Sequence, residues 1–525
     1  MIQDNFPQIG KDVIESLTLG MYEDCRFIFR EYIQNSADQI DKARKSGLLG
    51  LNEDEIHILI NPDERTIVIE DNATGIERDK FIPILRNIAH STKTRGEDKG
   101  FRGIGRLGGL GYCSKLRFES SYHGENCKCV MTWDADLLKK IINDRDTKEE
   151  AVDVLQRVTD TKEYAEDANK HYFRVILEGV TSKELLNADN VREYLSMVAP
   201  VDIDSRFLFC SKIKKFMREN GMILDTYNIY INQEQIYKPY TNYIYEDNNG
   251  GKKKVDEIID VDFLLQKDSK GEFIYWGWYS LSQLNGQMKP QNIARGIRLR
   301  KENIQIGDEE ICKKFFSKTE DQRFSFYYFG EIHAVSKGLI PNSRRDYFSE
   351  SEECVVFERL IKQDFLNLKE LCYNVQRYRS NTKTINKAEE LYSKIQQKDK
   401  SGGYTSKKER ENLERQYNEY LQKSEQARKA LNAMNQKYLQ QGTPLSNILS
   451  KMTPVAPNSF QVSTPDQSDT PSARPMYRTE SPLYSKFSRA EKKVIRDIYA
   501  SITNAIPDEK QREALISKIE ADITK

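Results

Sequence analysis

Three polar side chains, Glu31, Asn35 and Asp38, recur at intervals of four and three residues within the segment FIFREYIQNSADQIDK. At 3.6 residues per turn, this spacing places them on one face of a helix. A carboxylate one turn before an amide suits a general base that activates water beside a metal ligand. A solvated polar stripe would show the same spacing, so this helix alone leaves both interpretations open.

The segment TIVIEDNATGI, Thr66 to Ile76, predicts a strand that ends in a loop. Asp71 lies at the end of this strand, where its carboxylate could accept a hydrogen bond from an exocyclic amine. Gly75 would let the loop backbone approach closely. The segment therefore predicts a recognition loop.

A third motif, GFRGIGRLGGLG, holds six glycines in the twelve residues from Gly100 to Gly111. Glycine costs about 0.5–1 kcal/mol relative to alanine in regular structure, so such a run usually serves close backbone approach. Backbone N–H groups that lead into a helix can cradle phosphate. No Gly-Lys-Ser/Thr follows, so the motif is not a Walker A loop.

In this order, the three motifs resemble those of the GHKL ATPases, which include gyrase, the ninety-kilodalton heat-shock chaperones, histidine kinases and MutL. FREYIQNSADQIDKAR is most similar to the heat-shock-chaperone form of the first motif, and HSTKTRGEDKGFRGIG to the MutL form of the lid. The resemblance implies a GHKL α/β sandwich that binds ATP and Mg²⁺.

The resemblance also assigns roles to individual residues. Glu31 would be the general base, Asn35 would hold Mg²⁺, and Asp71 would bind the adenine amine. Asp38 would shape the pocket near the base or the ribose. The remaining nucleotide contacts would come from the glycine loop and the lid, namely Gly75, Ser91, Thr92, Lys93, Gly100, Arg102, Gly103 and Gly105.

Two positions depart from the family pattern. The first glycine of the family's Asp-x-Gly-x-Gly motif is Ala73 here. A methyl group is tolerable there if φ is negative, so we expect nucleotide binding to survive. The family also has Gly-Thr before the last strand of the domain, where this chain has Lys170-His171. One adenine-side contact therefore has no assigned substitute.

The segment LIPNSRRDYF, Leu339 to Phe348, resembles the heat-shock-chaperone loop that carries an arginine to the γ-phosphate. The alignment selects Arg345, followed by Arg344, and Lys289 is a further candidate because MutL and gyrase use a lysine. A guanidinium binds phosphate through two donors and stays charged when desolvated. A turn whose arginines face solvent is the alternative.

Composition narrows the class of protein. The 525 residues predict two to four domains, and 81 basic residues balance 81 acidic ones. No apolar run approaches the roughly 20 residues of a membrane span, and the start lacks a signal-peptide pattern. The eight cysteines and five histidines show no metal-ligand spacing. We expect a cytoplasmic protein with no membrane partner.

Five parts are predicted along the chain. Residues 1–182 would be the ATP-binding domain, with an antiparallel-rich mixed sheet, helices on one face and a helical excursion over 137–170. Residues 183–352 would be a transducer-like α/β domain that includes a strand at 227–232, with Trp276 and Trp278 in its core. Residues 353–440 have heptad spacing, which predicts a coiled-coil helical hairpin or self-association through the same seam. A disordered linker over 441–485 and a helical tail over 486–525 follow.

Two functions fit this organisation. An ATP-gated homodimer that remodels a protein client, reached through the coiled coil or the tail, is favoured by the form of the first motif and the neutral charge. A DNA clamp similar to MutL or the Microrchidia proteins is favoured by the GFRG sequence, the coiled coil and the basic residues Arg295, Arg298, Arg300 and Lys301. A binding module without activity is the third possibility, and Glu31 argues against it.

Overall fold

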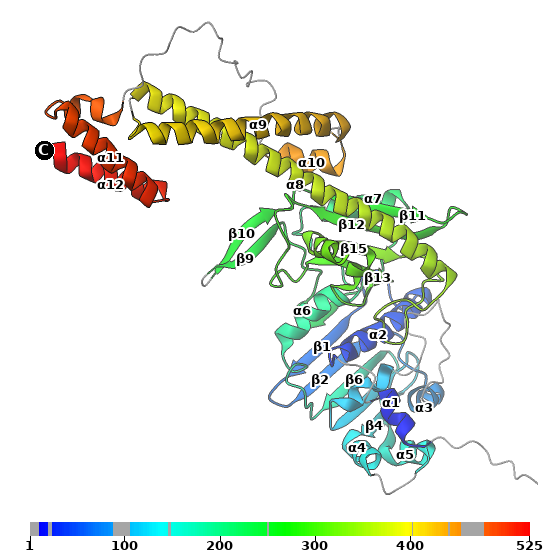
Figure 1. The fold of residues 1–525 in the computed structure, drawn as a ribbon. Helices are drawn as coiled ribbons and strands as arrows, with labels where there is room; N and C mark the ends of the chain where they lie inside the picture. The colour runs from blue at the N-terminus through cyan, green and yellow to red at the C-terminus, as the bar shows by residue number, and fades with distance from the viewer. Residues whose placement is uncertain are drawn as a thin grey trace, which may run out of the picture. The chain divides into compact units, whose positions relative to one another are not determined.

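The computed structural model describes residues 10–18, 24–87, 105–144, 149–248, 251–401, 403–438, 442–452 and 477–524. The chain divides into two compact units, with the boundary between Lys369 and Glu370 (Figure 1). Within the described ranges, no helix combines the length and apolarity that a membrane crossing requires.

The N-terminal unit begins with an eight-stranded sheet in the order β5-β4-β3-β6-β2-β1-β7-β8. Neighbouring strands are antiparallel except β1 and β7, which are parallel. The mixed, antiparallel-rich sheet predicted from the sequence is thus confirmed. The strand bounds are β1 Ile56–Asn61, β2 Thr66–Asp71, β3 Lys115–Ser121, β4 Cys127–Asp134, β5 Thr159–Ala165, β6 Tyr172–Glu178, β7 Ile229–Ile231 and β8 Glu234–Gln235.

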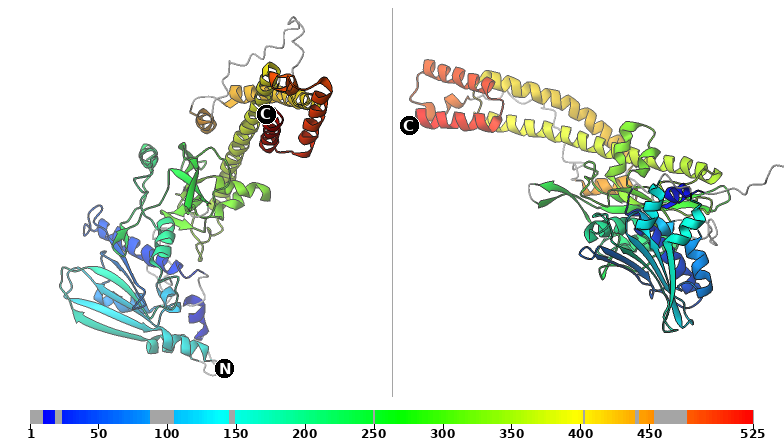
Figure 2. Two further views of the ribbon diagram at one scale, coloured as in Figure 1. Left: turned by 90° about the vertical axis from the view of Figure 1, so that its left-hand side faces the viewer. Right: turned by 90° about the horizontal axis from the view of Figure 1, so that it is seen from below.

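Helices cover one face of this sheet and share a continuous apolar core with it (Figures 1 and 2). The principal helix is α2, Phe27–Lys45, which buries Phe29, Ile33, Ala37 and Ile40. The other elements are α1 Asp12–Thr18, α3 Arg78–Arg86, the 3₁₀ helix η1 Gly105–Gly111, α4 Ala135–Asn143, α5 Ala151–Val158 and α6 Ala188–Val198. Because this apolar face of α2 packs on the sheet, it fixes the direction in which the polar residues of the helix point.

Two sequence expectations for this region are corrected. The helical excursion over 137–170 holds for α4 and α5, but Thr159–Ala165 forms the edge strand β5, which pairs with β4. The strand expected within 227–232 does form, as β7, but it pairs in parallel with β1 rather than entering the second sheet. Backbone pairing between segments far apart in sequence leaves no local signal, so neither result was predicted.

A second, five-stranded sheet has the order β11-β12-β15-β13-β14, with a separate hairpin of β9 and β10. Trp276 and Trp278 of β12 are buried in its core, as predicted. Residues 296–306 form a hairpin of two strands, β13 and β14. The bounds are α7 Cys210–Glu219, β9 Tyr243–Asn248, β10 Gly251–Glu257, β11 Asp260–Lys267, β12 Phe273–Leu281, β13 Gly296–Lys301, β14 Ile304–Ile306, η2 Ile311–Phe315, η3 Thr319–Tyr327 and β15 Phe329–Ala334.

A buried ionic cluster joins this second sheet to the end of α6. Glu331 forms ion pairs with Lys238 at 2.8 Å and Arg300 at 2.5 Å, and all three side chains are inaccessible to solvent. Arg300 also donates to the backbone carbonyl of Met197 at 2.6 Å. Burial raises the pKa of Glu331, but the charges of Arg300 and Lys238 outweigh burial and hold that pKa well below its usual value. The cluster therefore links two layers of the unit.

The basic residues that favoured a DNA clamp lie mostly inside the protein. Arg298, Arg300 and Lys301 are buried within β13. Arg295 and Arg298 pair with Glu309, and Lys301 donates to the carbonyl of Ser336. These residues therefore do not support the clamp alternative, because their side chains pair with internal acceptors rather than face phosphate.

In the C-terminal unit, the chain from Glu370 onward forms an antiparallel helical hairpin of α8, Glu352–Ser401, and α9, Lys407–Tyr438. Glu389 pairs with Arg428 at 3.1 Å, and the rings of Tyr392 and Tyr417 lie 5.6 Å apart. The heptad residues Leu413, Ser424, Ala427 and Leu431 are buried. The predicted hairpin is confirmed.

The segment predicted as a disordered linker, 441–485, contains helices among its described residues. Thr443 caps α10, Pro444–Lys451, by accepting from the N–H of Ser446 at 3.2 Å. The 3₁₀ helices η4, Arg478–Glu480, and η5, Pro482–Tyr484, precede the tail helices α11, Arg489–Ala505, and α12, Glu509–Thr524. Ser488 and Glu491 form a capping box at the start of α11.

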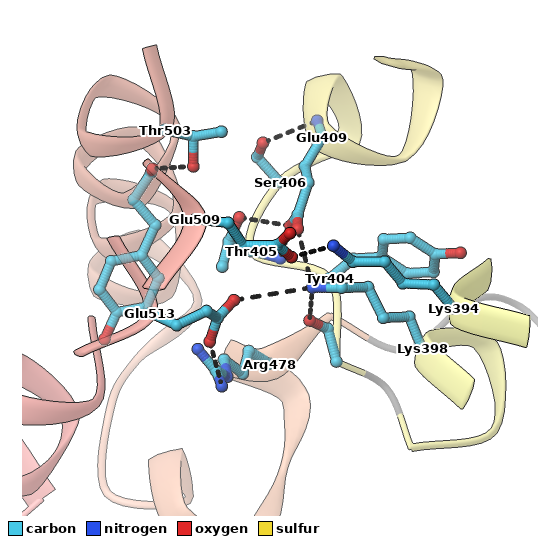
Figure 3. Close-up of polar contacts among 12 residues, drawn as sticks. Lys394, Lys398, Tyr404, Thr405, Ser406, Glu409, Arg478, Thr503, Glu509 and Glu513 are labelled. Atoms are coloured by element: carbon cyan, nitrogen blue, oxygen red, sulfur yellow. Dashed lines mark hydrogen bonds and ion pairs between the residues drawn. The ribbon is translucent and has the colours of Figure 1, made fainter. Parts of the chain in front are cut away.

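The tail contacts the tip of its own hairpin (Figure 3). The N–H of Arg478 donates to the carbonyl of Tyr404 at 2.9 Å, and its guanidinium pairs with Glu513 at 3.1 Å. Lys398 pairs with Glu409 at 2.8 Å, and Lys394 pairs with Glu509. Tyr404 is fully buried. The tail thus docks on its own chain, an outcome that the sequence left open.

We expect the variant Arg478→Ala to loosen this docking, because the ion pairs of Arg478 to Glu513 and Glu520 fasten α12 to η4, which bonds to the hairpin through the carbonyl of Tyr404. Amide exchange at residues 404–406 and 477–480 should quicken about fivefold, as expected for about 1 kcal/mol of lost interaction. Arg415→Ala, which removes an exposed arginine of α9, is the matched control. Equal exchange in both variants would show that apolar packing alone holds the tail.

Candidate nucleotide site

Glu31 lies on the partly buried face of α2, with its carboxylate between the glycine motif and a loop that follows the second sheet. A Cβ added to Gly105 would lie 2.2 Å from Oε2 of Glu31, so any larger residue would displace this carboxylate. On the other side, Oε1 lies 3.8 Å from Nη2 of Arg30 and 3.8 Å from Nε of Arg345. The structure thus brings together Glu31, Gly105 and Arg345.

Asn35 and Asp38 follow Glu31 along the same helix. Asn35 is half-buried one turn beyond Glu31, and Asp38 is buried. The two side chains and Glu31 offer carboxylate and amide oxygens, the donor types that Mg²⁺ prefers. The donor set fits this metal at the position predicted for Asn35.

Asp71 ends β2 as a buried carboxylate beside α2. It accepts hydrogen bonds from the hydroxyl of Ser36 and, at 3.1 Å, from the N–H of Ala73. Burial raises the pKa of Asp71 to about 6, although both hydrogen bonds oppose that rise. A carboxylate in such a place can accept from an amine donor of a ligand.

The loop after Asp71 approaches the neighbouring strands closely. Gly75 has φ +69°, and a Cβ there would lie 2.0 Å from the carbonyl oxygen of Ser121. The predicted need for glycine at this position is thus explained. Ala73 is absent from the residues with positive φ, so its methyl group is accommodated as expected.

Tyr32, which the sequence analysis did not select, fixes the start of η1. Its hydroxyl donates to the carbonyl of Arg106 at 3.0 Å and accepts from the N–H of Gly109 at 3.2 Å. It lies on α2 immediately after Glu31 and is buried. Its position next to the predicted base was the one signal available in the sequence.

Arg345 occupies a strained turn. Its φ of +56° is uncommon for a residue other than glycine, and such strain often accompanies functional sites. The turn is held because the N–H of Arg345 donates to Asn342 and its carbonyl accepts from Gly307 at 2.8 Å. Its side chain is mostly buried, whereas that of Arg344 is exposed.

Arg30 connects α2 to this turn. Its guanidinium donates to the carbonyl of Arg344 at 3.3 Å and lies over the ring of Phe27 at 4.4 Å. Lys289, the other candidate for the γ-phosphate, is exposed in the loop after β12. Of the three candidates, Arg345 is therefore the one paired with Glu31.

The predicted lid contacts cannot be compared with the structure. Ser91, Thr92, Lys93, Gly100, Arg102 and Gly103 lie outside the described residues.

Residues 25–165 match the family model described as histidine kinase-, DNA gyrase B- and HSP90-like ATPase. Similar proteins include the chaperone protein HtpG of Burkholderia cenocepacia, 29% identical over 143 residues, which are 24% of this chain and 23% of that protein. HtpG of Chlorobium phaeobacteroides is 33% identical over 87 residues, 15% of this chain and 14% of its own. HtpG of Salinispora tropica is 29% identical over 92 residues, which are 16% of this chain and 14% of that protein.

The sheet, the helix that carries Glu31 and the loop after Asp71 form a domain of the α/β-sandwich class. With the family match, this domain is a GHKL ATPase domain of the HSP90-like kind. The aligned regions span less than a quarter of the length of these HtpG proteins, so the resemblance is confined to that part of the chain.

We expect Gly105→Ala to impair hydrolysis without unfolding the domain. The added methyl group would meet the flexible end of Glu31 rather than backbone, so the carboxylate should move. A displacement of about 1 Å at a reacting group can cost on the order of 100-fold in rate. Gly286→Ala is the matched control, because no atom lies near its Cβ position. Equal phosphate-release rates in the two variants would contradict the placement of Glu31.

The raised pKa of Asp71 predicts a pH-dependent stability. Between a pH of about 4, where an unfolded carboxyl ionises, and about 6, the folded chain keeps a proton that the unfolded chain has lost. The contribution of Asp71 to the free energy of unfolding therefore falls as pH rises through this window, by about 3 kcal/mol. The stability of Asp71→Asn relative to that of the parent chain should therefore increase as the pH is raised from 4 to 7.5. Parallel melting curves at both pH values would contradict the raised pKa.

Proposed function

We propose that this protein is a Mg²⁺-dependent ATPase that works as an ATP-gated, dimerising conformational machine on a protein client. The observation that carries the proposal is the meeting of Glu31, Gly105 and Arg345 at the helix whose Ser36 bonds to Asp71. A water-activating carboxylate, a glycine backbone and a cation supplied from beyond the second sheet are the parts that phosphoryl transfer needs.

Each side chain has a separate task in this proposal. Glu31 accepts the proton of the attacking water, and Asp71 accepts a hydrogen bond from the adenine amine. Arg345 keeps its charge in a desolvated place and stabilises the oxygens of the transferred phosphoryl group. When bound, Mg²⁺ neutralises phosphate charge, and Asn35 would hold it.

The ion pair between Glu31 and Arg345 would hold both side chains in place until ATP binds. The Glu31 carboxylate lies 3.8 Å from a guanidinium nitrogen of Arg30 and 3.8 Å from one of Arg345. Phosphate oxygens would compete with Glu31 for Arg345, which would leave the carboxylate facing the attacking water. Substrate binding would thereby tie the turn of Arg345, and with it the second sheet, to the first sheet.

The proposal keeps residues 183–352 as the transducer that carries Arg345. It assigns the hairpin of 353–440 and the docked tail of 486–525 to contacts with a client or effector. Burial of the basic β13 residues removes the surface that supported a DNA clamp, so a protein client is the better-supported partner.

The test measures phosphate release by the full chain with ATP and Mg²⁺, with ATP and EDTA, and with GTP and Mg²⁺. We expect release that needs Mg²⁺ and prefers ATP. Undetectable release with Mg-ATP, or equal release in EDTA, would overturn the proposal. Addition of duplex DNA should leave the rate unchanged, and a salt-sensitive stimulation would instead favour the clamp.

A further inference from the structure

The chain departs from the family at Lys170-His171, immediately before β6, and the structure shows what His171 does there. Its Nδ1 lies 2.9 Å from the carbonyl oxygen of Ala73 and 3.0 Å from that of Asn72. The half-buried imidazole thus meets the middle of the loop that follows Asp71.

These two contacts fix the state of the ring nitrogen. Backbone carbonyl oxygens can only accept hydrogen bonds, so Nδ1 of His171 must carry a hydrogen and donate to both. In the neutral ring, Nε2 is then the acceptor. The loop is therefore held by a donor that the ring supplies in either charge state.

Ala73 relays this restraint to the buried carboxylate. Its carbonyl accepts from His171, and its N–H donates to Oδ1 of Asp71 at 3.1 Å. A change in the backbone angles of Ala73 would disturb both hydrogen bonds. His171 therefore controls where Asp71 points through a path of two hydrogen bonds.

Other contacts hold the two ends of the loop, and in its middle the hydroxyl of Thr74 donates to Oε1 of Gln39 at 3.4 Å. The side chain of Asn72 donates to the carbonyl of Glu53 at 2.8 Å and accepts from the N–H of Glu55 at 2.9 Å. At the other end, the N–H of Ile76 donates to the hydroxyl of Ser120 at 2.7 Å. Among the described residues, His171 is the side chain that bonds to the carbonyl of Ala73.

We propose that His171 is a positioning residue that aims the Asp71 carboxylate at the base of the nucleotide and so sets the preference for adenine over guanine. The proposal rests on the ATP-binding function proposed above. Adenine offers an amine donor to a carboxylate at a fixed place, whereas guanine offers a carbonyl oxygen that the carboxylate repels. A loosely held Asp71 would lose affinity for ATP and discriminate less against GTP.

Direct titration of full-length protein with ATP and with GTP tests this role without need for turnover. We expect His171→Ala to weaken ATP binding on the order of tenfold, as for the loss of a buried hydrogen bond, and to narrow the ATP-to-GTP affinity ratio by a similar factor. His171→Asn retains a side-chain N–H donor and should restore most of both values. In turnover, His171→Ala should raise KM and leave kcat within about twofold, because Glu31 lies on another element.

His57→Ala is the matched control, since His57 is an exposed histidine on β1 that packs against Tyr230. Equal ATP affinities for the parent chain and His171→Ala would overturn the positioning role. The positioning role would also be overturned if His171→Ala and His171→Asn lost ATP affinity equally and the ATP-to-GTP affinity ratio stayed constant. That result would indicate a general loss of folding. Failure of the parent chain to bind ATP would instead reject the proposed function itself, which separates the two failures.

Discussion

Glu31→Ala should lower kcat for ATP hydrolysis by about 10²–10⁴-fold, the range expected for loss of a positioned general base. ATP affinity should change little, because the adenine contact belongs to Asp71. The melting temperature should stay close to that of the parent chain, since Glu31 is only partly buried and its two ion pairs are long, at 3.8 Å each. Phosphate release and ATP titration on the same preparation measure both quantities.

Glu31→Gln provides a shape-matched comparison, because it keeps the side-chain volume beside Gly105 and removes only the base. Both Glu31 variants should be inactive to a similar degree. If Glu31→Gln turned over ATP at the parent rate, Glu31 would be a structural residue and another group would have to activate the water.

Arg345→Ala should reduce kcat on the order of 10³-fold, because an arginine that stabilises phosphoryl-transfer charge is worth 10³–10⁵ in rate. Alanine keeps the Cβ that makes the positive φ unfavourable, so the backbone strain at this position should be unchanged and the stability should change by less than about 1 kcal/mol. ATP binding in the absence of turnover should be weakened far less than kcat.

Arg344→Ala discriminates between the two neighbouring candidates. The side chain of Arg344 is exposed, and its contact with Arg30 uses the backbone carbonyl, which the substitution keeps. We expect Arg344→Ala to lose far less activity than Arg345→Ala. A larger loss in Arg344→Ala would move the role to that residue, and a loss confined to Lys289→Ala would assign it to the loop after β12.

Much of the first sheet follows directly from local pattern. Strand β2 and its loop were predictable because β-branched residues run into Asp71, and α2 because its apolar residues recur with helical period. The condition for tolerating Ala73, a negative φ, could be stated from the sequence, and the structure shows that Ala73 meets it.

The rest depended on packing that sequence does not display. In the sequence, Arg298 and Arg300 look like part of an exposed charged strand. In the structure, their charges are balanced inside the protein by Glu309 and Glu331. The role of His171 was invisible because its partners are backbone carbonyls almost 100 residues earlier in the chain. Strand β7 joined the first sheet through parallel pairing with β1, a long-range choice of partner.

We propose that ATP closes two copies of the chain into a dimer that hydrolysis reopens. The most direct test of this proposal is the solution mass of the Glu31→Ala protein with Mg-ATP, with Mg-ADP and without nucleotide, because loss of the base should hold the ATP state. The account predicts a dimer with Mg-ATP and a monomer in the other two samples. The same mass in all three, whether monomer or dimer, would contradict ATP-gated association.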